Sequence, residues 1–205
     1  MQQAQRIGIT GGIGSGKSYV ARLLTRQYSI PIYDCDAEAK RLNVQSDEIR
    51  QALIRLVGPD VYASDGSLQR SVLAQYLFAS SDNAQRVNAI VHPVVARDFE
   101  QWAQRQSDLG QSIVALESAI LFESGFDHFI DYSINVSAPH DLRLQRAMLR
   151  DEASRQSIEA RMQRQMSDQE RSSLSHFTLI NDGRELEVQI QYILQEIRAK
   201  NKKKQ

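Results

Sequence analysis

The sequence predicts an α/β fold: a five-stranded parallel sheet with helices on both faces, a helical insertion and a helical lid. Two observations indicate this class. Short apolar segments that suit buried strands alternate with segments of helical periodicity along most of the chain. A glycine-rich loop follows the first of these strands and leads directly into a helix. Because parallel strands need helical crossovers, the alternation predicts three layers, α/β/α.

The glycine-rich loop lies between a strand over Arg6–Thr10 and a helix over Lys17–Gln27. Its residues 11–18 read G-x-x-x-x-G-K-S, the pattern of a phosphate-binding loop. Glycines allow positive φ angles and bring backbone N–H groups against phosphate oxygens. The N-terminus of the next helix adds the positive end of its dipole. We therefore predict a core of the P-loop NTPase type that binds ATP or GTP.

Two loop residues have separate expected roles. Lys17 can reach the β and γ phosphates, and the hydroxyl of Ser18 can hold Mg²⁺. ATP or GTP, together with Mg²⁺, is thus the predicted cofactor set from the loop, and the family resemblance given below implies ATP. The residues predicted to bind the nucleotide here are Gly12, Ile13, Gly14, Ser15, Gly16, Lys17, Ser18 and Tyr19.

A second predicted strand, Ser29–Tyr33, is followed by two acids, Asp34 and Asp36. In an open α/β sheet, ligands bind at the carboxyl ends of the strands, so both acids are candidates for the site. Either could instead cap the following helix, Ala37–Leu42. We assign Asp34 to the strand end and Asp36 to the cleft as a base.

Helical periodicity dominates from Asp47 to about Asp108, and the length of this block predicts an inserted helical subdomain. Pro93 is expected to start a helix, where its missing N–H does no harm. His92, directly before it, could contact a substrate phosphate or ribose. It could equally cap or pack at a helix junction.

A third strand is predicted over Ser112–Leu116 and a fourth over Asp131–Val136. Glu117 follows the third strand, where it could hold a metal-bound water or order the phosphate loop; the alternative is a solvent-exposed charge. The fifth strand, Phe177–Ile180, ends in a turn that begins at Asn181. Asn181 is placed where an adenine could lie, although a turn residue is also expected here.

A charged helical hairpin follows the fourth strand. Its first helix, Leu142–Arg150, carries Arg143, Arg146 and Arg150, and its second is expected over Ser154–Met166. Arginines at helical spacing are often a solvated face paired with acids. Here they follow a strand end, and the planar fork of arginine suits phosphate oxygens. We therefore favour a lid that closes over ATP.

Composition excludes several classes of protein. The 205 residues are 41% hydrophobic and 24% charged, with 25 basic and 25 acidic side chains, so no electrostatic footprint for nucleic acid is present. One cysteine, Cys35, excludes an intramolecular disulfide. No apolar run approaches the roughly 18 residues of a membrane span, and no apolar signal segment precedes the first strand. These features predict a cytoplasmic protein that binds neither nucleic acid nor membrane. We expect a monomer or weak homo-oligomer.

Several short motifs, in this order along the chain, resemble those of the dephospho-coenzyme A kinase family. The resemblance covers Ile7 to about Ile197. The motifs are Thr10–Ser18, Asp34-Cys-Asp36, Val91-His-Pro93, Leu121-Phe-Glu123, Arg146-x-x-x-Arg150-Asp151 with Ser157, Glu159, Arg161 and Gln165, and Asn181-Asp-Gly183. The resemblance implies transfer of the ATP γ-phosphate to the ribose 3′-hydroxyl of dephospho-coenzyme A.

The resemblance also implies three parts: a core over residues 1–40, 109–137 and 176–205, a substrate-binding helical domain over 41–108, and a lid over 138–175. Asp36 takes the role of catalytic base, with Lys17 and Arg146 at the transferred phosphate. The candidates for substrate contact are Asp34, Lys40, His92, Glu117, Arg143 and Arg150.

The sequence departs from the family pattern at four places. Tyr19 stands where the family has a small hydroxyl residue, and Lys40 replaces a usual His or Arg. Glu117-Ser-Ala119 replaces Asp-x-Pro, and Arg143 replaces a frequent Gln. A carboxylate is retained at the third place, and positive charge is added to the lid at the fourth.

Two other functions compete with this reading. One is a phosphate-loop kinase for another hydroxyl, such as that of a nucleoside, nucleotide, shikimate or gluconate. The other is a nucleotide-dependent switch, against which the sequence has no guanine-specifying Asn-Lys-x-Asp. A base at Asp36 and an arginine lid would also have no purpose in a simple switch.

Overall fold

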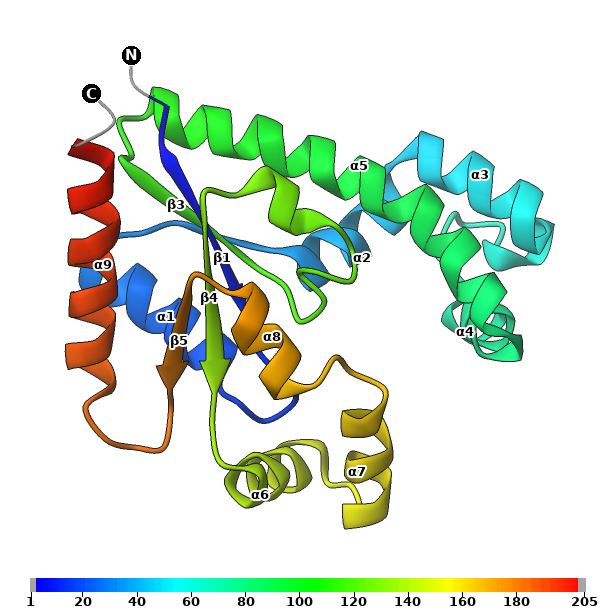
Figure 1. Ribbon diagram of the computed structural model, residues 1–205. Coiled ribbons are helices and arrows are strands. Elements are labelled where there is room, and N and C mark those ends of the chain that lie inside the picture. The colour runs from blue at the N-terminus through cyan, green and yellow to red at the C-terminus, as the bar shows by residue number, and fades with distance from the viewer. Residues whose placement is uncertain (1–2, 203–205) are drawn as a thin grey trace. The chain divides into compact units, whose positions relative to one another are not determined.

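The computed structural model describes residues 3–202 (Figure 1). The chain forms two compact units. The core unit consists of the described residues up to Ile32 and from Gln106 onward, and the helical unit is Tyr33–Arg105. The predicted division into core, substrate domain and lid at residues 41, 108, 138 and 175 stays a prediction.

The sheet has five strands in the order β2-β3-β1-β4-β5, which confirms the predicted number. The central strand β1 is parallel to β3 and β4, and β4 is parallel to β5. This order brings the ends of β1, β3 and β4 together, with Ile9 opposite Glu117 and Thr10 opposite Asn135. The strands are β1 (Gln5–Thr10), β2 (Ile32–Asp34), β3 (Ile113–Glu117), β4 (Tyr132–Ser137) and β5 (Phe177–Ile180).

Helices cover both faces of the sheet. On one face, α1 (Lys17–Tyr28) and α9 (Leu186–Lys202) share a buried core with side chains such as Ile7 and Ile9 of β1. Gly8 between them faces the other side, where an added Cβ would lie 2.9 Å from Leu121. Strands buried on both faces explain the nearly continuous apolar runs of the sequence.

The segment predicted to be a lid, for which we keep the name lid, follows β4. It contains the helices α6 (His140–Asp151), α7 (Arg155–Gln163) and α8 (Asp168–Leu174). The prediction of one helix over 154–166 is wrong at its end, and α8 was not predicted. Ser167 and Glu170 form a reciprocal capping box that starts α8, which is why the chain leaves α7 early. Beyond this turn, α8 packs on β4 (Figure 1).

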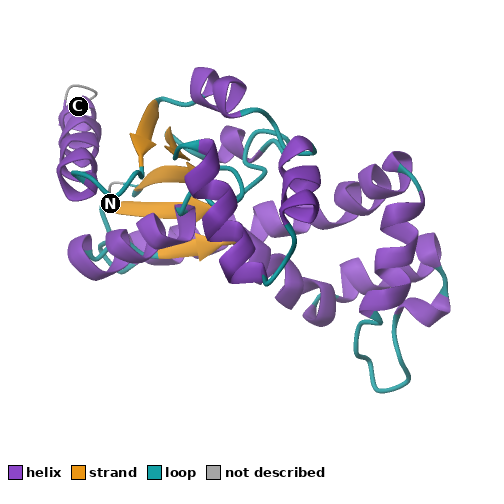
Figure 2. Cartoon of the chain, turned by 90° about the horizontal axis from the view of Figure 1, so that it is seen from below, coloured by secondary structure: helices purple, strands orange, loops and turns teal. Residues whose placement is uncertain are grey.

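The helical unit contains α2 (Cys35–Gln45), α3 (Asp47–Val57), a 3₁₀ turn η1 (Pro59–Val61), α4 (Arg70–Ala79) and most of α5 (Ser81–Asp108). Figure 2 shows the strands gathered in one place, with long stretches of chain drawn only as helices and the loops that join them. An aromatic cluster joins the two ends of this unit's sequence. The Tyr33 ring lies 5.3 Å from that of Phe99 and 5.4 Å from that of Trp102.

The prediction that Pro93 starts a helix is wrong, because α5 continues through this residue. An interior proline removes one helical hydrogen bond and crowds the preceding turn. Val91, Val94, Val95 and Phe99 are all buried at helical spacing across it. Burial of this continuous apolar face offsets the local cost.

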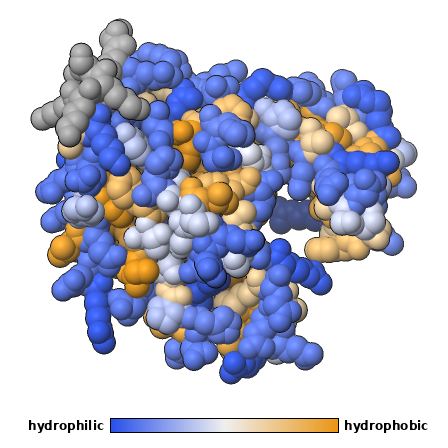
Figure 3. All heavy atoms as spheres, viewed as in Figure 1, coloured by the Kyte–Doolittle hydropathy of each residue, from blue (hydrophilic) through white to orange (hydrophobic). Residues whose placement is uncertain are grey.

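The surface shows no extended apolar band on the face seen in Figure 3, where hydrophobic residues form small groups among hydrophilic ones. Within residues 3–202, every helix is too short or too polar to cross a membrane. Among the exposed large apolar side chains, Phe78 and Leu149 lie far apart in the sequence, whereas Val188 and Tyr192 lie four residues apart on α9.

Candidate active site

The phosphate-binding loop has the left-handed backbone that its glycines predict. Gly14 and Gly16 have φ angles of 76° and 91°. Gly16 is also the N-cap of α1, and no described side chain caps this helix end. The first turn of α1 therefore presents its dipole toward the loop, an arrangement that suits an anion.

Two neighbouring residues approach the loop so closely that only glycine fits. An added Cβ at Gly16 would overlap the side-chain amide of Asn181, and one at Gly14 would overlap the main chain of Arg143. The Asn181 Nδ2 donates to the Ser15 carbonyl at 2.8 Å. Asn181 thus contacts the predicted nucleotide site by holding the loop itself.

Glu117 lies at the end of β3 and contacts two loop residues through one oxygen. The Ser18 Oγ donates to Glu117 Oε1 at 2.5 Å, and the Lys17 Nζ lies 3.5 Å from the same atom. Glu117 is 7% exposed, so the alternative of a solvent-exposed charge at the strand end is wrong. A buried carboxylate beside an ammonium and a hydroxyl can orient both groups toward bound phosphates.

The three predicted lid arginines of α6 have different partners. The Arg143 Nε donates to the carbonyl of Ile13 at 3.0 Å, and Arg146 donates to the carbonyl of Asn181 at 2.9 Å. Both therefore lie at the loop. Arg150 instead pairs with the adjacent Asp151 at 2.6 Å and is largely exposed.

Asp151 accepts hydrogen bonds from Arg150 and also from Arg161 of α7. These two guanidinium groups hold the pKa of the Asp151 carboxyl well below its usual range. The cluster ties the end of α6 to α7. Arg150 in this arrangement helps to shape the lid, and its predicted contact with substrate stays a prediction.

The remaining predicted site residues belong to the helical unit. Asp34 is the N-cap of α2 and accepts from the Ala37 N–H at 3.0 Å, one of the two uses expected for it. Asp36 and Lys40 are exposed on α2. His92 is half-buried inside α5, where burial lowers the pKa of its imidazole, so the expected helix junction is absent at this residue.

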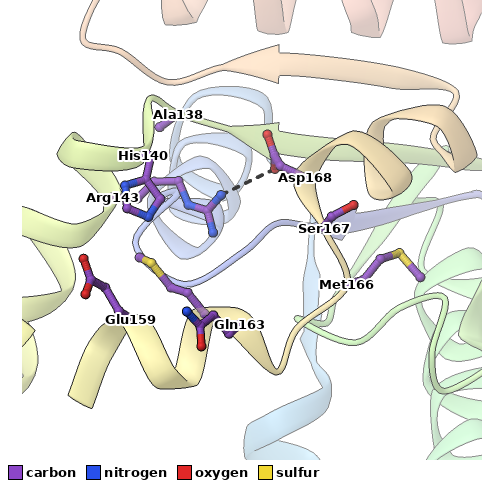
Figure 4. Close-up of a pocket in the computed structure, with 9 residues that line it drawn as sticks. Ala138, His140, Arg143, Glu159, Gln163, Met166, Ser167 and Asp168 are labelled. Atoms are coloured by element: carbon purple, nitrogen blue, oxygen red, sulfur yellow. Dashed lines mark ion pairs between the residues drawn. The ribbon is translucent and has the colours of Figure 1, made fainter. Parts of the chain in front are cut away.

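A cavity of about 600 Å³ opens among the lid helices, on the side of Arg143 that faces Asp168 (Figure 4). Asp168 accepts from the Ser137 hydroxyl and lies 3.7 Å from Arg143 and 3.5 Å from the buried Arg171. The cavity is lined by Ala138, His140, Arg143, Glu159, Met162, Gln163, Met166, Ser167 and Asp168.

Sequence reasoning missed the roles of Asp168 and Gln165 at this site. The Gln165 Oε1 accepts from the Ile13 N–H of the loop at 2.8 Å. The Ser167-x-x-Glu170 pattern is a capping box, and it was a readable signal that a helix begins at Asp168. For Gln165, the family resemblance was the signal available in the sequence.

The residues near Ser18 suit a magnesium ion held mainly by phosphates. Among the described residues, no group of three or more His, Cys, Asp or Glu side chains could hold a metal ion. Mg²⁺ commonly binds through one or two protein oxygens, waters and substrate phosphates. The Ser18 hydroxyl and the Glu117 carboxylate offer such oxygens beside the loop.

A parallel sheet, a phosphate-binding loop after its central strand and an arginine-bearing helix over that loop define a P-loop kinase. A sequence profile of the dephospho-CoA kinase family matches residues 5–187. The chain therefore belongs to this family.

Curated relatives agree with this assignment. A protein named dephospho-CoA kinase from Bacteroides fragilis (strain YCH46) is 47% identical over 180 residues, which cover 88% of this chain and 86% of the relative. Another, from Porphyromonas gingivalis, is 43% identical over 196 residues and 95% of each chain.

Solved structures agree on the fold. TT1252 from Thermus thermophilus has a TM-score of 0.80 and 34% identity, over 95% of this chain and 98% of its own. The dephospho-CoA kinase from Campylobacter jejuni has a TM-score of 0.68 at 19% identity, over 96% of this chain and 98% of its own. A shikimate kinase from Acinetobacter baumannii shares the fold alone. It has a TM-score of 0.53 at 16% identity, over 96% of this chain and 94% of its own.

Proposed function

We propose that this protein transfers the γ-phosphate of ATP to the ribose 3′-hydroxyl of dephospho-coenzyme A, giving coenzyme A and ADP. This is the last step of coenzyme A synthesis. The observation that carries the proposal is the family match over residues 5–187, because it spans the loop, the helical unit and the lid together. The loop alone would support any P-loop kinase.

The loop binds the triphosphate in this proposal. Backbone N–H groups from Gly12 to Tyr19 and the dipole of α1 receive the phosphate oxygens. Lys17 neutralises charge on the β and γ phosphates, and Glu117 keeps the Lys17 ammonium directed into the loop. Asn181 keeps the loop beside the end of β5, the edge at which we place the adenine.

Magnesium is the second expected cofactor, and Ser18 would hold it, with Glu117 accepting from a bound water or from the Ser18 hydroxyl. A magnesium ion held there would supply positive charge against the negative charge that develops on the phosphates during transfer. The hydrogen bond between Ser18 and Glu117 supports this assignment, because it holds the Ser18 hydroxyl in one orientation at the proposed magnesium site.

The acceptor reacts with help from both units. Asp36 deprotonates the 3′-hydroxyl, while Arg143 and Arg146 cover the charge of the transferring phosphoryl group. The helical unit supplies Asp34, Lys40 and His92 for contact with dephospho-coenzyme A. We also place the reaction in the cytoplasm, because a single cysteine, Cys35, suits a reducing compartment.

The test uses a matched pair of acceptors. Purified protein with Mg·ATP is offered dephospho-coenzyme A or its 3′-deoxy analogue, and the product is located by ³¹P NMR. The proposal expects a new phosphate on the 3′-oxygen with the first acceptor and only background ADP with the second. Phosphate on another oxygen, or equal ADP release with both acceptors, would contradict it.

A further inference from the structure

Ile13 lies in the phosphate-binding loop, and lid side chains bind both of its backbone polar groups. Its N–H donates to Gln165 Oε1 at 2.8 Å, and its carbonyl accepts from Arg143 Nε at 3.0 Å. Arg143 belongs to α6, whereas Gln165 lies in the turn between α7 and α8. Two separate parts of the lid thus hold one loop residue from both sides.

The side chain of Ile13 adds an apolar contact to these two hydrogen bonds. It packs against the lid's own small core of Leu144, Ala147 and Ile158. The loop is also in close contact with Arg143 on either side of Ile13. An added Cβ at Gly12 would meet the Arg143 guanidinium, and one at Gly14 would meet its main chain.

These contacts fix the two peptide planes that join Ile13 to its neighbours. A glycine-rich loop has many backbone conformations, and ordering it at the moment of binding costs conformational entropy. The loop binds phosphates through N–H groups whose directions depend on these planes. Holding the planes in advance therefore strengthens nucleotide binding without touching the reacting atoms.

We infer that Gln165 is a positioning residue for the nucleotide, which acts by holding the Ile13 peptide of the phosphate loop in its binding conformation. The inference rests on the proposed function only for the identity of the nucleotide as ATP. Because the effect is the same in the ground state and the transition state, it belongs to KM for ATP and leaves kcat unchanged.

The test compares Gln165→Met with Gln156→Met. Methionine keeps the length of glutamine and removes the acceptor. Gln156 is an exposed residue of α7 in the same lid and does not line the cavity. Loss of one hydrogen bond predicts about a tenfold rise in the Kd and KM for ATP in Gln165→Met, with kcat held within about twofold. The Gln156 variant should match the wild type.

A second readout follows the Ile13 amide directly. In the nucleotide-free protein, hydrogen exchange at the Ile13 N–H should accelerate in Gln165→Met and not in Gln156→Met. Gln165→Asn, whose amide is one methylene too short, should behave as Gln165→Met does and replaces it if methionine impairs folding.

Unchanged Kd and KM in both Gln165 variants would overturn the inference, as would a fall in kcat at constant KM. Nucleotide Kd is measured by calorimetry without an acceptor. A protein that fails to phosphorylate dephospho-coenzyme A would therefore refute the proposed function while leaving the comparison of Gln165 variants intact.

Discussion

Glu117 combines two contacts that usually belong to different residues of a nucleotide site. One oxygen receives the Ser18 hydroxyl and lies near the Lys17 ammonium, in a buried setting where both interactions are strong. The carboxylate thereby orients both Ser18, the proposed magnesium ligand, and Lys17, the proposed phosphate ligand. Loss of the Glu117 charge should therefore impair activity by disturbing the orientation of these two side chains.

The substitution Glu117→Gln tests this role. The amide still accepts from Ser18 but carries no charge for Lys17, so we expect the Mg²⁺ concentration for half-maximal rate to rise by about tenfold or more. A titration of rate against Mg²⁺ at saturating ATP measures it. Glu187→Gln, on the exposed side of α9, is the control and should leave the curve in place. An unchanged curve in Glu117→Gln would remove the residue from this role.

Asp36 is the expected base, and its exposure in the first turn of α2 leaves the carboxylate accessible to an acceptor hydroxyl. Asp36→Asn should lower kcat by at least about 100-fold while the Kd for ATP changes little, because general-base catalysis contributes rate rather than nucleotide binding. Steady-state kinetics and calorimetry measure the two quantities. Asp60→Asn, another exposed acid of the helical unit, serves as control, and comparable rates in the two variants would disprove the assignment.

Residue identities at the loop could be read from the sequence, because glycine spacing, Lys17 and Ser18 carry their chemistry in their type. The tertiary contacts of these residues could not be read from the sequence. That Glu117 is buried against Ser18, or that Gln165 reaches Ile13, depends on strand order and on where α7 ends. A single sequence without structure contains only a weak signal for either contact.

At the scale of elements, the two errors of sequence reasoning have one cause. Local signals predicted a helix start at Pro93 and a helix end at Met166, but tertiary contacts decided both. Buried valines continue α5 through Pro93, and the capping box at Ser167 begins α8. The predicted ends of the strands, in contrast, lie within three residues of the observed ends, because buried strands are apolar runs in the sequence.

Because Pro93 lies inside α5, we predict that Pro93→Ala stabilises the protein. Alanine restores an N–H to the helix and removes the ring clash, which should raise the free energy of unfolding by roughly 1–3 kcal/mol. Urea denaturation measures it, with Glu100→Ala on the same helix as an exposed control that should change it by less than about 0.5 kcal/mol. A lower stability in Pro93→Ala would show that the proline itself is needed there.

The Asp151 cluster predicts a pH dependence for the lid. The pKa of this carboxyl is depressed in the folded state, so its stabilising effect is complete above the unfolded value of about 4 and is lost as pH falls further. At pH 7, Asp151→Asn should be less stable by at most about 1 kcal/mol, since the pair is partly exposed. Urea curves of the two proteins should converge below about pH 4. A gap that persists there would contradict the ionic origin, and Glu152→Gln should show no such trend.

At the scale of the whole molecule, the fold class and the five-stranded sheet could be predicted, whereas the order β2-β3-β1-β4-β5 could not. Strand pairing between segments such as β1 and β3, more than 100 residues apart, leaves no mark in local composition. Family membership rests on motifs spread over residues 5–187. The function follows from that whole set of motifs rather than from the loop.

ADP release from Mg·ATP is the most direct measurement of the central claim, with dephospho-coenzyme A, shikimate, gluconate, nucleosides and nucleoside monophosphates each offered alone. We expect fast turnover with dephospho-coenzyme A and only background release with the others. Fast turnover with a different acceptor would keep the ATP site and refute the substrate. Background release with every acceptor would contradict the kinase function altogether.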